Sequence, residues 1–352
     1  MIRLRASHLV PLAVLALAAG LPAAAAAPAA AATTTYTITN LGSLGSGGTQ
    51  PEAINASGQV TGFSDTSTVT TFLCGYPRRT CHSHPQHAFL WSNGTMTDLG
   101  SLDGADGGSS GEAINSSGEV AGISQTTTAG VTHAALWTGT TMVDLGALAP
   151  LSSGNSSAYG INDSGQVVGD WEDSTGTNHP WLYSNGTMTS LPVPSGLTDP
   201  SCVADSINNN GEIIGDCRDA SGNEHPVVWQ NGTVTVLGTL GGLQVTLLAG
   251  INNNGQIAGW ATTSTGATVG FLDSNGTVTN LGSFTPAALN DNGVMIDGVD
   301  EIYSGGTVQN LNNLLPANSG YEIAVTFGIN DNGQIAAKAT VNGSYAGVLL
   351  TP

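Results

Sequence analysis

Seven copies of one short motif constrain the fold of this 352-residue chain more than any other feature. The motif reads Ile-Asn-x-x-Gly-x followed by Val or Ile, and the sixth copy departs from it as "LNDNG". Successive copies are 38 to 60 residues apart, which is the size range of a propeller blade. The copies begin at Ile54, Ile114, Ile161, Ile207, Ile251, Leu289 and Ile329.

Each repeat unit divides into four short strands, which we name a to d in chain order. In the second unit they are "GEAIN", "EVAGIS", "HAALW" and "TMVDLG", separated by Gly-rich and Asn-rich turns or by a loop. Asn and Gly adopt positive φ at low cost, as antiparallel hairpin turns require. The sequence therefore predicts an all-β fold, a seven-bladed β-propeller of four-stranded antiparallel blades.

The seventh unit has strands a to c but no strand d. The stretch "TYTITNLGSLG" at 35–45 matches a strand d and has no a, b or c before it. We therefore predict that this N-terminal strand completes the last blade, which closes the ring and removes an exposed sheet edge.

The first 32 residues have the layout of a secretory signal peptide: a basic start, an apolar run and an Ala-rich stretch. We expect 1–32 to be removed or disordered and 33–352 to form a single extracellular propeller domain. Removal of Arg3 and Arg5 leaves four basic against 25 acidic residues, a balance of −21. Such a charge disfavours nucleic acid and anionic membranes as partners.

Four cysteines in an exported chain indicate two disulfides. If Ile207 faces Glu212 across the a–b turn of the fourth unit, then Cys202 lies directly opposite Cys217, which permits a cross-strand bridge. Cys74 and Cys81 would then close a small loop of their own.

The stretch "HAFLWSNGTMTDLGSL" at 87–102 resembles the HAF family of extracellular repeat proteins, and weaker copies cover nearly all of 36–352. Later copies drift, for example to "HPW" at 179–181 and "VGF" at 269–271. The resemblance implies a secreted repeat protein and brings with it no established biochemical activity.

Blade order places the uniform a–b and c–d turns on one face and the variable b–c and d–a loops on the other, where binding is expected. The longest loop, 65–86, carries the predicted ligand-binding residues Tyr76, Arg78, Arg79, His82 and His84. A cationic, aromatic loop closed by Cys74 and Cys81 suits an anionic ligand or partner. The alternative is a surface insertion that its disulfide merely holds in place.

A metal site is not predicted, because Cys81, His82 and His84 have no second ligand pair at zinc spacing. The turns around "NDSG", and Asp103 with Asp106, offer too few carboxylates for a typical calcium loop. No cofactor is expected.

Histidines recur at the start of strand c, and Trp91, Trp137 and Trp229 follow them by four residues. A group repeated from blade to blade is more typical of structure than of catalysis. We expect each histidine to make a buried hydrogen bond to a neighbouring backbone group, and the tryptophans to pack the blades. These histidines are His87, His133, His179 and His225.

Acidic residues on the b–c side of the third and fourth blades are the only catalytic candidates, chiefly Asp170 and Asp216. The leading hypothesis is a secreted, monomeric, non-catalytic propeller that binds a glycan or an extracellular protein. One alternative is a polysaccharide hydrolase or lyase that uses the two aspartates. Another is a purely structural surface or matrix protein.

Overall fold

The computed structural model describes residues 35–45, 47–74, 79–148, 154–198 and 200–352, and within them no side chains of 71–82. The expected signal segment, Tyr76 and Arg78 therefore lie outside the described residues. No helix in the described ranges is long and apolar enough to cross a membrane.

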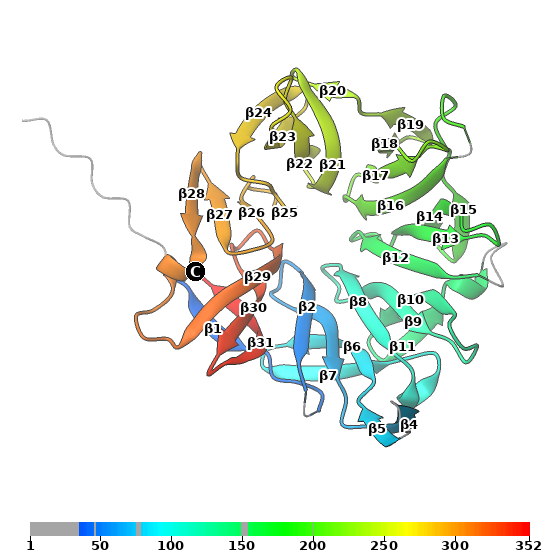
Figure 1. The fold of residues 1–352 in the computed structure, drawn as a ribbon, viewed down its shortest axis with the longest axis vertical. Coiled ribbons are helices and arrows are strands. Elements are labelled where there is room, and N and C mark those ends of the chain that lie inside the picture. The colour runs from blue at the N-terminus through cyan, green and yellow to red at the C-terminus, as the bar shows by residue number, and fades with distance from the viewer. Residues whose placement is uncertain (1–34, 46, 75–78, 149–153, 199) are drawn as a thin grey trace, which may run out of the picture. The chain divides into compact units, whose positions relative to one another are not determined.

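Seven antiparallel sheets, counted over the described residues, are arranged around a common centre as the blades of a β-propeller (Figure 1). Strand a of each blade is innermost and strand d outermost (Figure 1). The first blade is β2 (Thr49–Ile54), β3 (Val60–Asp65), β6 (Gln86–Ser92) and β7 (Thr95–Gly100). The second is β8 (Ser109–Ile114), β9 (Val120–Gln125), β10 (Thr132–Thr138) and β11 (Thr141–Asp144). The third is β12 (Ser156–Ile161), β13 (Val167–Glu172), β14 (Asn178–Ser184) and β15 (Thr187–Ser190).

The remaining blades follow the same order with two departures from the predicted four regular strands. The fourth blade is β16 (Ser201–Ile207), β17 (Ile213–Arg218), β18 (Glu224–Gln230) and β19 (Thr233–Val236). The fifth gains a short strand: β20 (Thr239–Leu240), β21 (Leu243–Ile251), β22 (Gln256–Thr262), β23 (Thr268–Ser274) and β24 (Thr277–Gly282). The sixth has two-residue inner strands: β25 (Ala288–Leu289), β26 (Met295–Ile296), β27 (Glu301–Ser304) and β28 (Thr307–Asn310). The seventh is β29 (Tyr321–Ile329), β30 (Ile335–Val341), β31 (Ser344–Thr351) and β1 (Thr37–Asn40).

A hairpin and three short 3₁₀ turns complete the elements assigned in the described ranges. The hairpin, β4 (Thr70–Cys74) with β5 (Arg79–Ser83), lies in the b–c loop of the first blade. The 3₁₀ turns are η1 (Gly104–Asp106), η2 (Gly146–Leu148) and η3 (Leu311–Leu314).

The predicted strand exchange is confirmed. Strand β1 pairs antiparallel with β31, so that Thr37 lies opposite Thr351 and Asn40 opposite Val348. Tyr36, directly before β1, is buried in the core of the last two blades, and its backbone amide donates to the Leu314 carbonyl oxygen at 2.9 Å. The N-terminal strand therefore closes the ring by pairing and by packing.

The turn residues, and a glycine of strand b that packs closely against strand a, account for much of the repeated sequence pattern. Four c–d turns place Asn at positive φ before Gly, as hairpins of this length require; these are Asn93, Asn185, Asn231 and Asn275, with φ from 49° to 54°. The b–c turn of the seventh blade has the same pair, with Asn342 at a φ of 51°. In five blades, strand b carries a glycine whose added Cβ would lie 1.9 to 2.2 Å from a carbonyl oxygen of strand a. Only glycine permits that approach; these residues are Gly62, Gly122, Gly169, Gly215 and Gly259.

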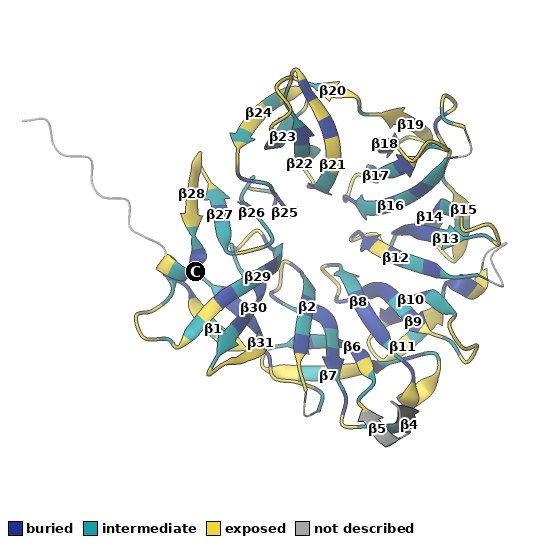
Figure 2. Ribbon diagram, viewed as in Figure 1, coloured by how far each residue is buried: buried dark blue, intermediate teal, exposed yellow. Residues whose placement is uncertain are grey.

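The core lies within and between the blades, while the outer strands are largely exposed (Figure 2). The predicted packing role of Trp91, Trp137 and Trp229 is confirmed, because each is at most 5% exposed and belongs to a separate apolar cluster. Trp181 is equally buried in the third blade. Burial of such large rings is a main source of blade stability.

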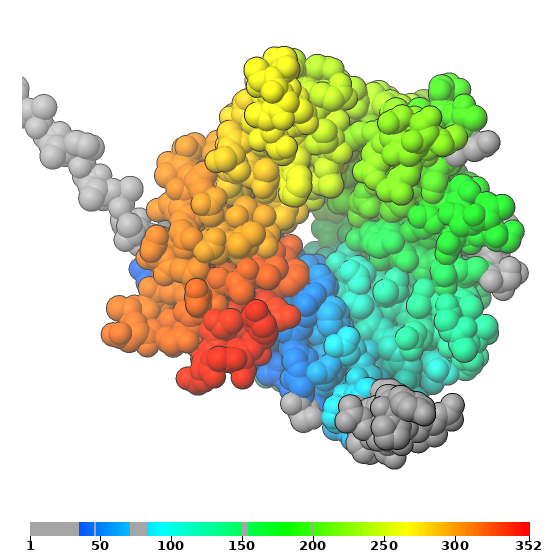
Figure 3. Space-filling view, in the orientation of Figure 1, coloured from blue at the N-terminus to red at the C-terminus, as the bar shows by residue number. Residues whose placement is uncertain are grey.

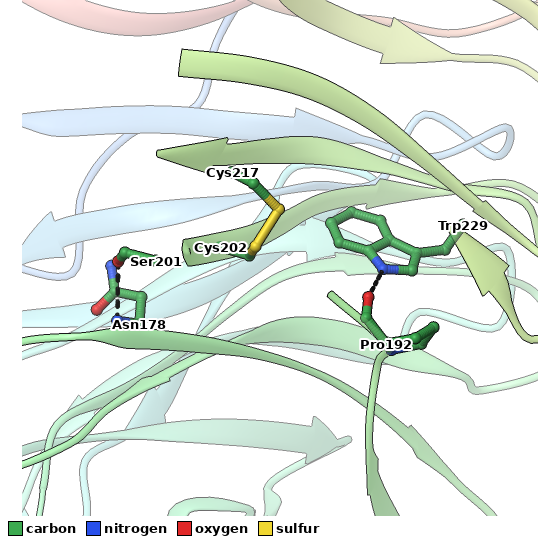
Figure 4. The surroundings of a disulfide bond; sticks show 6 residues. All are labelled: Asn178, Pro192, Ser201, Cys202, Cys217 and Trp229. Carbon is green, nitrogen blue, oxygen red and sulfur yellow. Dashed lines mark hydrogen bonds between the residues drawn. A yellow bond between two sulfur atoms is a disulfide. The ribbon is translucent and has the colours of Figure 1, made fainter. Parts of the chain in front are cut away.

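The Cys202–Cys217 disulfide is present and joins strands a and b of the fourth blade (Figure 4). The predicted pairing that led to it is wrong in detail, because Ile207 lies opposite Ile213 and not Glu212. A β-bulge between Ala204 and Ser206 shifts the register by one residue and brings the cysteines opposite each other. The expected Cys74–Cys81 bridge concerns side chains that are not described.

Candidate functional site

The repeated asparagines form a closed ring of hydrogen bonds at the centre of the propeller. Each side-chain amide donates to the backbone carbonyl oxygen of the equivalent asparagine in the next blade, at 2.9 to 3.2 Å. The seven residues, all at most 5% exposed, are Asn55, Asn115, Asn162, Asn208, Asn252, Asn290 and Asn330. Each Oδ1 also accepts two backbone amides of its own a–b turn, as Asn55 does from Ser57 and Gln59. The motif therefore encodes both the turn and the contact between blades.

A second, incomplete ring of hydrogen bonds involves the residue that follows each asparagine. There the backbone amide donates to a side-chain oxygen in the next blade, at 2.7 to 2.9 Å; the chain runs Ser116, Asp163, Asn209, Asn253, Asp291 and Asp331. It stops at Ala56, which has no side-chain acceptor. Both rings line a central hollow of about 330 Å³, and the space-filling view is hollowed at the centre of the ring (Figure 3). The two rings therefore tie neighbouring blades together at this end of the channel.

Side chains that break the repeat lie on the inner strands, ahead of the asparagine ring in the chain direction. Six inner strands carry a β-bulge two residues before the motif Ile, and β-bulges re-aim side chains. The bulged residues are Glu52, Glu112, Tyr159, Asp205, Ala249 and Phe327. Strand a runs from the loop face to the a–b turn, so each bulge precedes the asparagine ring. Four consecutive blades thus present a polar or acidic group there.

Strand b adds two aspartates beside these bulges. Asp170 of β13 lies opposite Ser157 of β12, and Asp216 of β17 lies opposite Val203 of β16. Both residues were predicted on the b–c side of their blades, and both lie inside strand b. We define the inner-strand cluster as Glu52, Glu112, Tyr159, Asp170, Asp205 and Asp216.

Burial raises the pKa of the acids of this cluster. It raises the pKa of Asp205 to about 7, and the charges of Asp216 and Asp170 add to that rise. It also raises the pKa of Asp170 to about 6, although the Tyr159 hydroxyl acts in the opposite direction. The pKa of Asp216 is raised by burial and by the charge of Glu224, while Arg218 lowers it. The predicted pair, Asp170 and Asp216, therefore belongs to one electrostatically coupled group.

The first two blades contribute a second acidic region of the cluster. Burial raises the pKa of Glu52 to about 7, against the hydrogen bond that Gln50 Nε2 donates at 2.7 Å. Lys338 Nζ donates to Gln50 Oε1 at 3.3 Å and lies 4.9 Å above the ring of Tyr345. Burial also raises the pKa of Glu112.

Sequence reasoning missed Glu52, Glu112, Tyr159 and Asp205. The signal was available in the repeats themselves: the position two residues before the motif Ile is Glu, Glu, Tyr, Asp, Ala, Ala and Phe in successive blades. The residue that follows it is Ala, Gly or Ser in every blade. Variation beside such a nearly constant position indicates a binding position on a fixed scaffold.

The predicted ligand-binding loop is described only in part. Tyr76 and Arg78 lie outside the described residues, and Arg79 and His82 belong to β5, whose side chains at these positions are not described. His84 is held in place, with its Nδ1 2.9 Å from the Thr68 carbonyl oxygen. The role of this loop stays a prediction.

The recurring histidines bind carboxylates, so the predicted backbone partner is wrong. His87 and His133 reach across to strand d, where Nδ1 lies 2.8 Å from Asp98 and 2.9 Å from Asp144. In the next two blades the partner comes from the b–c turn, 2.9 Å for His179 with Asp173 and 3.0 Å for His225 with Asp219. In each of these four blades an aspartate of the same blade therefore holds the histidine of strand c, from strand d in the first two and from the b–c turn in the next two.

No three His, Cys, Asp or Glu side chains in the described part of the chain converge closely enough to hold a metal ion.

No protein-family model and no curated protein matches the chain. Among solved structures, it is similar to the β-propeller domain of the Trilobed protease from Pyrococcus furiosus, with 8% identity and a TM-score of 0.47 over 91% of this chain and 94% of that one. It is also similar to TolB from Acinetobacter baumannii (12% identity, TM-score 0.41, 82% of this chain, 65% of that one). A gluconolactonase from Xanthomonas campestris gives 11% identity and a TM-score of 0.40 over 93% of this chain and 99% of that one. The chain thus spans slightly less than two thirds of TolB.

Proposed function

We propose that this protein is a secreted, monomeric and non-catalytic β-propeller that binds an extracellular glycan through the loop side of its channel. One observation carries the proposal. Residues that break an otherwise uniform repeat occupy the bulges of four consecutive inner strands, and the acids of strand b lie beside two of these bulges, ahead of the asparagine ring in the chain direction of strand a. A rigid scaffold that varies at one place is typical of a binding protein.

The chemistry of the cluster supports a hydroxylated ligand. Protonated carboxyl groups donate and accept hydrogen bonds, and ionised ones accept them, so a set of acids that titrates near neutral pH can meet sugar hydroxyls in either role. Tyr159 adds an aromatic ring that is 37% exposed on an inner strand. The cross-strand disulfide and the secretory layout of 1–32 support an extracellular setting.

Incubation of the purified protein with insoluble cell-wall and plant polysaccharides tests the proposal. Protein depletion from the supernatant without release of sugar is the expected result. The E52Q/D205N variant, altered at the inner-strand cluster, should stay in the supernatant. A D103N/D106N control, which removes two charges outside the cluster, should be depleted like the unaltered protein. Absence of binding to every polysaccharide would refute the proposal.

Acid catalysis is the second candidate, and one observation favours it. Asp170 and Asp216 come from neighbouring blades, both influence Asp205, and burial raises the pKa of all three into or toward the range of a general acid. A hydrolase or lyase would release soluble sugar in the same experiment. The D170N and D216N variants would then lose turnover while they retain the fold.

A further inference from the structure

A continuous chain of side-chain contacts crosses the seam between the last blade and the first. Lys338 of β30, in the last blade, donates from Nζ to Oε1 of Gln50 on β2, in the first, at 3.3 Å. The same Nζ lies 4.9 Å from the centre of the Tyr345 ring, on β31. Gln50 Nε2 donates in turn to Glu52 Oε1 at 2.7 Å, which joins this chain to the inner-strand cluster. We name Lys338, Gln50 and Tyr345 the seam triad.

Strand register places the cation and the ring on the face of the last blade that meets the first. Lys338 lies opposite Gly347, and Tyr345 comes two residues before Gly347 on the same strand. Opposed residues, and residues two apart in a strand, point to the same face of a sheet. A Cβ on Gly347 would lie 3.0 Å from Thr49 Cγ2 and 3.1 Å from the Thr49 carbonyl oxygen. The close approach of the two blades therefore holds Lys338 and Tyr345 beside the start of β2.

The Tyr345 side chain is open to solvent. At 63% exposed it is the most exposed of the large apolar and aromatic residues in the described ranges. Single exposed rings are common on protein surfaces, so the cation held beside this one is what distinguishes it. The ring offers a flat apolar surface against which a pyranose can lie.

Lys338 is a cation without a carboxylate partner in the described part of the chain. The protein has 25 acidic and six basic residues, yet none of the described ion pairs involves Lys338, whereas Arg218 pairs with Glu224. A neutral amide oxygen and an aromatic ring hold its ammonium group in place and leave the charge uncompensated. An anionic group of a ligand can supply the missing partner.

Glu52 does not take that role at slightly acidic pH. Burial raises the pKa of Glu52 to about 7 and outweighs the opposing effects of the Gln50 hydrogen bond and the Lys338 charge. At pH 6 most Glu52 side chains therefore carry a proton, and a neutral carboxyl group can donate to a sugar hydroxyl or accept from one. The positive charge of Lys338 then remains for the ligand.

We propose, building on the proposed glycan-binding function, that the seam triad is a subsite for a uronic acid within a polysaccharide. A uronic acid carries its carboxylate at the edge of its own pyranose, so that one sugar meets both the Tyr345 ring and the Lys338 ammonium group. The negative balance of the chain as a whole disfavours a dense polyanion, although charges beyond about 8 Å are screened at physiological ionic strength. The ligand that fits is therefore a largely neutral polysaccharide with isolated uronic acids.

The test compares two ligands that differ in one ionisable group. Calorimetric titration of the purified protein uses a xylotetraose that carries one glucuronic acid, and its methyl ester, at pH 6 in about 0.15 M NaCl. We expect the free acid to bind about fivefold more tightly. The K338Q variant should bind the acid no better than the ester. The R218Q control removes the same charge from another described cation and should keep the preference.

The Y345A variant tests the aromatic surface separately. We expect it to bind the acid and the ester about tenfold more weakly, because both lose the ring against which the pyranose lies. Thermal melting checks that K338Q, R218Q and Y345A are folded. Unchanged affinity of folded Y345A for both ligands would contradict the subsite.

The other outcomes separate this inference from the proposed function. Equal affinity of the unaltered protein for acid and ester, or a preference that persists in K338Q, would overturn the uronic acid subsite and leave glycan binding in place. Loss of the preference in R218Q as well would overturn the subsite in favour of a general effect of charge. The subsite also falls alone if neither oligosaccharide binds while another polysaccharide depletes the protein. If no polysaccharide binds at all, the proposed function falls with it.

Discussion

The side-chain amide of Asn330, in the last blade, donates a hydrogen bond of 2.9 Å to the backbone carbonyl oxygen of Asn55, in the first. The two residues are 275 positions apart in the sequence. This bond is the last of seven and turns a row of blade contacts into a closed ring.

Loss of that closure should destabilise the whole propeller. The N330A variant leaves the Asn55 carbonyl oxygen and two turn amides without their partner, and we expect the free energy of unfolding to fall by about 2–3 kcal/mol. Asn332 is the matched control: it also donates to a first-blade carbonyl oxygen, that of Ala56, at 2.9 Å, but it is exposed. Chemical denaturation should show a clearly smaller loss for N332A. Equal losses of stability in N330A and N332A would mean that burial of the hydrogen bond does not determine how much it contributes to stability.

Removal of the N-terminal strand should open the seventh blade. A protein that begins at residue 42 lacks β1 and the buried Tyr36, so we expect a melting temperature lower by about 10 °C or more. A synthetic peptide of 34–45 should restore the melting temperature as its concentration rises. Failure of the peptide to stabilise the truncated protein would contradict the role of β1 as a replaceable outer strand.

The Cys202–Cys217 bridge closes a sequence separation of 15 residues, for which loop entropy predicts about 3 kcal/mol of stabilisation. We expect the C202S/C217S variant to unfold at a correspondingly lower denaturant concentration. Addition of a reductant should destabilise the unaltered protein and leave this variant nearly unchanged. The C74S/C81S variant is the control for the other cysteine pair.

Stability should fall as pH rises through the neutral range. Burial raises the pKa of Asp205 to about 7, so the folded protein holds this proton at pH values where the unfolded chain has released it. The native state therefore binds more protons between about pH 4 and pH 7, and rising pH favours unfolding. The stability of the D205N variant should fall less steeply with rising pH. At pH 8 its free energy of unfolding should exceed that of the unaltered protein by about 2 kcal/mol.

Asp163 provides the control for the pH experiment. Hydrogen bonds from Ser116 and Asn209 lower the pKa of Asp163 against the opposing effect of burial, so it is ionised in both states above pH 5. The stability that ionised Asp163 contributes is lost only as pH falls through the acidic range. The slope between pH 5 and pH 8 should be the same in D163N as in the unaltered protein.

The contact that joins Tyr159 to Asp205 can be tested through Gly160. An alanine Cβ there would lie 3.0 to 3.2 Å from Val168 and from the backbone of Ser206 and Ile207, so the two inner strands must separate by a few tenths of an ångström. We expect G160A to lower the free energy of unfolding by about 1–2 kcal/mol. Gly196 has open space around its Cβ position, and G196A should have little effect. Melting curves of G160A and G196A compare the stability of the two variants.

Much of the fold could be predicted because it depends on short-range patterns. The spacing of the motif, the Asn-Gly turns and the displaced strand at 35–45 each specify a local structure that repeats. The disulfide was predicted for an incomplete reason. The sequence predicts Ile207 opposite Glu212, whereas Ile207 lies opposite Ile213, and it is the bulge between Ala204 and Ser206 that brings the two cysteines opposite each other. Local rules do not reveal such bulges, because they depend on how a strand meets the next blade.

The sequence by itself determined the architecture, the closure of the ring and two of the acidic residues. Only the tertiary structure decided that Asp170 and Asp216 share one electrostatic group with Asp205, and that Tyr159 lies beside them. The physical reason is distance along the chain. Hydrogen bonds within a hairpin are set by neighbouring residues, whereas the meeting of side chains from two blades depends on the rotation between blades and on bulges in both inner strands.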